Sequence, residues 1–129
     1  SGSADSAWTS TWRYGQSGLR THHLPLKGTE IFQFRSPAIR PAGEDNNKLD
    51  LFMRSGIMRR HQGGKSTFIA LHEPFAKETW INQVSAKGEE IIVQYTAGGK
   101  SITDRIKLNK DGAVQVKSTA GWAYASKNK

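Results

Sequence analysis

The chain of 129 residues contains no cysteine and no long run of apolar residues. Without cysteine it can form no disulfide, carry no catalytic thiolate and bind no zinc through sulfur ligands. A helix that crosses a bilayer needs about 20 consecutive, mainly apolar residues, and no segment of this sequence approaches that length. These two absences exclude thiol chemistry, cysteine-based metal sites and a helical membrane span.

Acidic residues are also scarce, so the chain is strongly basic. Nineteen lysines and arginines stand against eleven aspartates and glutamates, which gives a formal net charge of +8. A cationic surface of this kind attracts polyanions such as acidic polysaccharide, nucleic acid or an anionic membrane surface. The same charge is also typical of a surface that only keeps a domain soluble.

Apolar residues recur at every second position in several segments. Ile91, Val93 and Tyr95 share one side of such a segment, and glycine turns at Lys87-Gly88 and Gly98-Gly99 bound it. This alternation is typical of antiparallel strands with one face on a core and one in water. The sequence therefore predicts an all-β fold, an antiparallel β-sandwich of about nine to ten strands, near residues 19–26, 30–35, 48–54, 57–61, 66–73, 79–86, 89–96, 101–108 and 113–118, with a tenth around Trp122.

The N-terminal residues differ in composition from the rest of the chain. Ser1-Gly2-Ser3 resembles a cloning remnant, and residues 1–11 are rich in serine, alanine and threonine. We expect residues 1–11 to be a flexible lead-in. Residues 12–126 then form a single β-sandwich domain, a length within the usual range for one domain.

The histidines and small motifs show no spacing that carries chemistry. His22 and His23 are adjacent, so in a strand they point to opposite faces. His72 is followed by Glu73-Pro74, without a second histidine four residues on, and Gly63-Gly64-Lys65-Ser66 lacks the upstream glycine of a phosphate-binding loop. We expect no metal site, no cofactor and no complete active site.

A group of cations is the first candidate for ligand contact. Seven of the eight arginines lie in residues 1–64, and Arg54, Arg59, Arg60 and Lys65 fall within twelve positions. If this segment is a hairpin, these side chains converge near one loop and could bind a sulfated or carboxylated chain. The alternative is a solvated hairpin whose charges protect a sheet edge.

Tryptophan and tyrosine supply the second candidate. Trp12 and Tyr14 lie two positions apart and could form an exposed surface for stacking on sugars, or a seam against a neighbouring domain. Trp80 alternates with Asn82 and Val84, and we expect it in the core. Residues 32–35 are the one segment that interleaves aromatic and basic residues, and they lack the glycine-flanked signature of RNA-recognition sheets, which disfavours nucleic acid.

Several short segments over residues 12–118 share a further pattern. They are Trp12 with Gly18-Leu19-Arg20-Thr21-His22-His23-Leu24, then Gly28-Thr29-Glu30-Ile31, Arg35-Ser36-Pro37, the strand Thr67-Phe68-Ile69-Ala70-Leu71-His72-Glu73-Pro74-Phe75 with its Glu-Pro-aromatic step, and the meander from Glu89 to Val116. Together they resemble the β-rich C-terminal portion of heparinase II/III-like polysaccharide lyases.

The resemblance implies a parent enzyme that cleaves acidic polysaccharides by β-elimination, removing the C5 proton of a uronic acid and leaving an unsaturated sugar. The catalytic groups of that family come from a helical toroid and a central β-sandwich, and this sequence contains no toroid, so no catalytic or metal residue is carried over. The implied role is a module, inactive alone, that packs against neighbouring domains of the parent chain or binds an acidic polysaccharide in the periplasm or outside the cell. The rival interpretation is a protein-interaction or nucleic-acid-binding β domain that acts through its basic surface.

Overall fold

The computed structural model describes residues 2–37 and 53–126. Within these ranges the chain forms eleven β-strands and no helix, and every strand pairing is antiparallel. The expected all-β antiparallel fold is confirmed. Alternation of apolar and polar residues, with glycine turns between the segments, accounts for this outcome.

Contacts divide the chain into two compact units. Unit 1 consists of Ser1–Ser6 and Leu26–Thr67, and unit 2 of Ala7–Pro25 and Phe68–Lys129. Each described sheet lies within one unit, because no described strand of one unit pairs with a described strand of the other. The single domain expected over residues 12–126 stays a prediction.

Unit 1 contains one three-stranded sheet in the order β1-β4-β5. Its strands are β1 (Gly2–Ser3), β4 (Thr29–Pro37) and β5 (Met53–His61). The sequence predicted two strands, over 48–54 and 57–61, whereas β5 runs unbroken through Gly56 because that glycine lies opposite Phe34 and pairs with it. Residues 48–52 of the first predicted strand lie outside the described residues.

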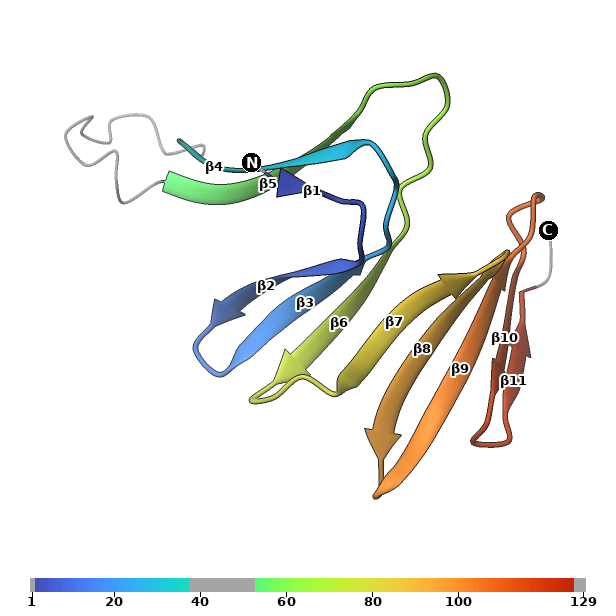
Figure 1. Ribbon diagram of the computed structural model, residues 1–129. Coiled ribbons are helices and arrows are strands. Elements are labelled where there is room, and N and C mark those ends of the chain that lie inside the picture. Colours follow the sequence, from blue (N-terminus) through green and yellow to red (C-terminus); the bar gives the residue numbers. More distant parts are fainter. Residues whose placement is uncertain (1, 38–52, 127–129) are drawn as a thin grey trace. The chain divides into compact units, whose positions relative to one another are not determined.

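Unit 2 contains a three-stranded and a five-stranded sheet (Figure 1). The three-stranded sheet has the order β2-β3-β6, and the five-stranded sheet is a meander from β7 to β11. Gly88 and Gly99 adopt φ values of 62° and 73° in the turns of this meander, a conformation that glycine tolerates without steric cost. The strands are β2 (Trp8–Tyr14), β3 (Ser17–His23), β6 (Ala70–Ala76), β7 (Ile81–Lys87), β8 (Glu90–Ala97), β9 (Lys100–Leu108), β10 (Val114–Ser118) and β11 (Ala123–Ala125).

Strand β2 begins inside the segment that was expected to be a flexible lead-in. Its residues 8–11 pair with β3, and the indole of Trp8 stacks on the imidazole of His23 with ring centroids 3.7 Å apart. The small polar residues indicated flexibility, but threonine and tryptophan also suit a strand once a partner is present. The pairing with β3 therefore overrides the local composition over residues 8–11.

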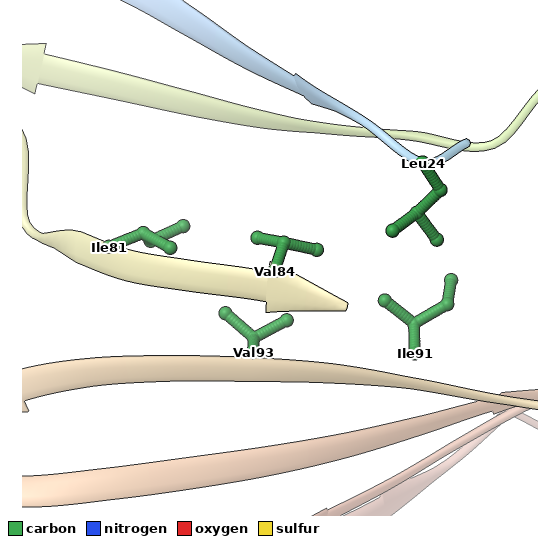
Figure 2. Packing of buried hydrophobic residues seen from close by; sticks show 5 residues of the cluster. All are labelled: Leu24, Ile81, Val84, Ile91 and Val93. Carbon is green, nitrogen blue, oxygen red and sulfur yellow. The ribbon is translucent and has the colours of Figure 1, made fainter. Parts of the chain in front are cut away.

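The core of unit 2 lies between its two sheets. Leu24, at the end of β3, packs with Ile81 and Val84 of β7 and with Ile91 and Val93 of β8 (Figure 2). Each such side chain contributes about 1.5–3 kcal/mol when it is fully buried. The two sheets thus face each other through apolar residues in a sandwich-like arrangement.

Trp80 does not lie in this core, contrary to the expectation. Trp80 is 46% exposed, and its indole lies perpendicular to the Tyr95 ring with the ring centroids 5.3 Å apart. The register of β7 against β8 shifts between Ile81 and Gln83. A bulge of this kind adds one residue to one strand, so Ile81 and Val84, three positions apart, are both buried.

Gly18 offers a test of the packing between β3 and β6. A Cβ atom at this position would lie 2.5 Å from the Phe75 ring and would also meet the backbone of Trp12. We expect Gly18→Ala to lower the free energy of unfolding by about 1–3 kcal/mol, as measured by urea denaturation. Gly64→Ala is the control, because nothing lies within 4 Å of its added Cβ. Equal stability of the two variants would contradict the packing described here.

Candidate functional site

The four predicted cations do not converge on one loop. Arg54, Arg59 and Arg60 all lie on β5, and Lys65 follows that strand. The expected hairpin around residues 63–64 is absent, because β5 pairs with β4 whereas β6 pairs with β3. Arg59 points to the face opposite Arg54 and Arg60, and six strand positions separate Arg54 from Arg60 by about 20 Å.

Arg60 already has partners within unit 1. Its Nη2 and Nε atoms lie 2.6 Å and 2.8 Å from Oε2 of Glu30, and its guanidinium lies 5.0 Å from the centroid of the Phe32 ring. Burial lowers the pKa of the neighbouring Arg59, although an arginine stays cationic at neutral pH. Ligand contact by these arginines and by Lys65 stays a prediction.

Trp12 and Tyr14 lie on one face of β2, as their spacing predicts. Trp12 is 41% exposed and Tyr14 is 93% exposed, while Leu19 lies directly opposite Trp12 on β3. A surface that stacks on sugar rings requires such accessible aromatic faces. The rings of Trp12 and Tyr14 are accessible in this way, and their contact with a ligand stays a prediction.

A fully buried carboxylate forms the most densely connected polar centre in the described part of the chain. Glu73 of β6 accepts hydrogen bonds at Oε2 from Nε of Arg20, at 2.7 Å, and from Nε2 of His22, at 2.8 Å. Its Oε1 accepts the backbone N–H groups of Trp80 and Ile81, at 2.5 Å and 2.8 Å. The carboxylate thus joins β3, β6 and the start of β7.

The register of β3 and β6 explains this centre. Arg20 lies directly opposite Glu73, and His22 is two positions further along the same face of β3. Nη2 of Arg20 also donates to the carbonyl oxygen of Ile81, at 2.5 Å. A carboxylate has about four lone-pair positions, and four donors occupy them here, so Glu73 has no position left from which to accept a substrate proton.

Opposing influences set the pKa of Glu73. Burial alone raises it, because a low-dielectric environment disfavours the charged form. The N–H of Ile81, then His22, Arg20 and the N–H of Trp80 act in the other direction, and the net effect lowers the pKa of Glu73 below its ordinary value. The group therefore stays ionised in the folded chain at neutral pH, which suits a structural anchor.

The remaining histidines are engaged in pairwise contacts. His23 and Ser10 share a hydrogen bond of 2.9 Å, His72 and Thr21 one of 3.0 Å, and His61 one of 3.3 Å with Thr29. A shallow pocket of about 160 Å³ is lined by Trp8, Arg20, His22, His23, Asn82 and their neighbours. Over the described ranges, no three histidine, aspartate or glutamate side chains gather as a metal site requires.

Sequence reasoning missed a second cationic surface, on the five-stranded sheet. A pocket of about 230 Å³ is lined by Arg105 and Lys107 of β9, Gln115 and Lys117 of β10, and Glu90 of β8. The sequence does contain the pattern of this surface. Arg105 and Lys107 flank Ile106, and Gln115 and Lys117 flank Val116, so the polar residues alternate with apolar ones. That these residues lie next to each other follows only from the register between β9 and β10.

Comparisons with known proteins identify no relative of this chain. No protein-family model matches it, and neither a curated protein nor a solved structure does. In the part of the chain that the structure describes, no helix is long and apolar enough to cross a membrane. The chemistry of its strands and surfaces is therefore the basis for a functional proposal.

Glu73→Gln tests whether the buried carboxylate is a structural anchor. We expect a loss of about 3 kcal/mol in the free energy of unfolding at pH 7, because Arg20 loses its counter-charge and the other donors lose a charged acceptor in a buried site. The pKa of Glu73 is lower in the folded chain than in the unfolded chain. The stabilisation is therefore present at a pH above the ordinary pKa of glutamate and is lost as the pH falls through the lower, folded value.

Thermal and urea unfolding between pH 2 and pH 7 measure this effect, and the gap between the two proteins should narrow in acid. Glu89→Gln is the control in the same unit, because its carboxylate is 70% exposed and lies 3.6 Å from Lys107. A surface pair of this kind contributes less than about 1 kcal/mol. A Glu73→Gln variant as stable as the Glu89→Gln variant would contradict the structural role.

Proposed function

We propose that the chain is the non-catalytic C-terminal β-sandwich module of a heparinase II/III-like polysaccharide lyase, which supports the catalytic domains or binds an anionic glycan. One observation carries this proposal: two of the segments on which the resemblance depends lie side by side. Strand β3, from the segment Gly18–Leu24, pairs with β6, from the segment Thr67–Phe75. Arg20 and His22 of the first segment bind Glu73 of the second.

The contacts of the ionisable side chains support the non-catalytic part of the proposal. β-Elimination requires a base that can accept the C5 proton of a uronic acid and an acid that can protonate the leaving oxygen. Four donors occupy the Glu73 carboxylate, and His22 is committed to it. The hydrogen bonds between these residues explain why arginine, histidine and glutamate occur at positions 20, 22 and 73 without a catalytic role for any of them.

The net charge supports the glycan-binding part of the proposal. A formal charge of +8 favours sulfated or carboxylated chains over neutral ones. The resemblance further implies a parent enzyme that acts in the periplasm or outside the cell, where acidic polysaccharide is the substrate. Binding would then hold the substrate near the catalytic domains.

Retention on heparin and on DNA columns at matched salt separates glycan recognition from generic attraction to anions. We expect the chain to elute from heparin at a higher salt concentration than from DNA, because screening removes non-specific binding first. An Arg59→Ala/Arg60→Ala variant tests the contacts predicted from the sequence on the same two columns. Equal elution of the chain from both columns would indicate non-specific charge only and would contradict glycan recognition.

A lyase assay tests the absence of catalysis in this module. We expect no rise in the absorbance of unsaturated uronate when the chain is incubated with heparin, heparan sulfate, alginate or hyaluronan, since Glu73 and His22 in the described part of the chain are committed to each other and not arranged for elimination. A lyase of the same family, in full length, is the positive control. Reproducible turnover by this chain would overturn the non-catalytic assignment.

A further inference from the structure

We propose that the polar face of the five-stranded sheet binds a sulfate or carboxylate group of a polysaccharide chain between Arg105, Lys107 and Lys117. These three side chains, with Gln115, form what we call the basic quartet. The choice of polymer rests on the proposed function. The anion site itself rests on the register and charges of β8, β9 and β10, which lie next to one another in the sheet (Figure 1).

Strand pairing brings the quartet together. Arg105 lies directly opposite Lys117, and Lys107 lies directly opposite Gln115. Arg105 and Lys107 are two positions apart on β9, a distance of about 6.8 Å along the strand. Because Ile106 between them belongs to the core side, the four residues of the quartet point to the other face and form a small rectangle.

The pairing of Arg105 with Lys117 is unfavourable in the absence of a ligand. Side chains directly opposite each other in an antiparallel pair have Cβ atoms about 5 Å apart, and like charges at this distance destabilise the sheet. An anion between them removes the repulsion and gains charge-assisted hydrogen bonds from both. The arrangement therefore favours the folded, anion-bound state.

The nearby carboxylates neutralise the cations only in part. Oε2 of Glu90 lies 3.1 Å from Nη1 of Arg105, and Oε2 of Glu89 lies 3.6 Å from Nζ of Lys107. The side chains of Arg105 and Lys107 are 50% and 45% exposed, so these are surface pairs of small energy. Lys117 forms no ion pair with any described residue.

The pocket between these side chains suits a small anionic group. Its volume is about 230 Å³. Glu90 and Glu89 pair with Arg105 and Lys107, so the three cations keep an excess of one positive charge, at Lys117. Arginine presents a planar fork of donors to sulfate or carboxylate oxygens, and lysine adds a mobile point charge. The amide of Gln115 can bond the hydroxyl groups next to such an anion on a sugar ring.

The lining residues favour a glycan over single-stranded nucleic acid. Sites for single-stranded nucleic acid combine cations with aromatic side chains on which bases stack. The pocket is lined by Glu90, Arg105, Lys107, Gln115 and Lys117, none of which is aromatic. Charge and amide groups, rather than stacking, therefore define what this pocket recognises.

The test compares two variants that lose the same charge. Arg105→Gln/Lys117→Gln removes the opposed cations of the quartet, whereas Lys100→Gln/Lys110→Gln removes two lysines of the same unit that do not line the pocket. Binding of a heparin octasaccharide is measured by titration calorimetry at 150 mM salt, and a single-stranded DNA of equal charge serves as the competitor. Thermal unfolding confirms that both variants are folded.

We expect the quartet variant to bind the octasaccharide at least tenfold more weakly than the unaltered chain, and the control variant to change by less than threefold. An equal loss of octasaccharide affinity in both variants would contradict the site at the basic quartet but not the proposed function. DNA that competes as well as heparin itself would overturn glycan recognition in both proposals. An unaltered chain without affinity for the octasaccharide would overturn the site and reduce the proposed function to support of the catalytic domains.

Discussion

The buried carboxylate of Glu73 is the constraint on which the rest of unit 2 depends. Removing a charge from water costs several kcal/mol unless donors replace the lost hydration. Those donors come from three places: Arg20 and His22 on β3, and the backbone at the start of β7. One side chain therefore links β6 to β3 and to the start of β7, and these contacts connect the two sheets whose apolar residues form the core.

Regular alternation made most of the fold predictable, and local irregularities account for the errors. The period of two in β8 correctly marks Ile91 and Val93 as core residues. The same rule fails for Trp80 because a bulge after Ile81 shifts the pattern by one residue. It also fails at Gly56, where a glycine that indicates a break lies within a continuous strand opposite Phe34.

The polar centres were harder to predict because their partners are distant in the chain. Glu73 and Arg20 are separated by 53 positions, and no local pattern specifies which strands pair. The spacing of the cations in residues 54–65 indicates one site only if this segment forms a hairpin, whereas β5 pairs with β4. Arg105 and Lys117 are also remote in sequence, and only their register shows that they lie opposite each other.

The two polar centres of unit 2 differ in what their charges require. Around Glu73, donors and acceptors match within the protein, so the centre stabilises the fold and offers nothing to a substrate. On the five-stranded sheet, cations outnumber carboxylates and two of them oppose each other, so a favourable arrangement needs an anion from outside. A catalytic base must keep a free lone pair, which the saturated carboxylate of Glu73 lacks. The contrast between this saturated centre and the unsaturated one on the five-stranded sheet therefore supports the proposal that anion binding takes place on the sheet and not at Glu73.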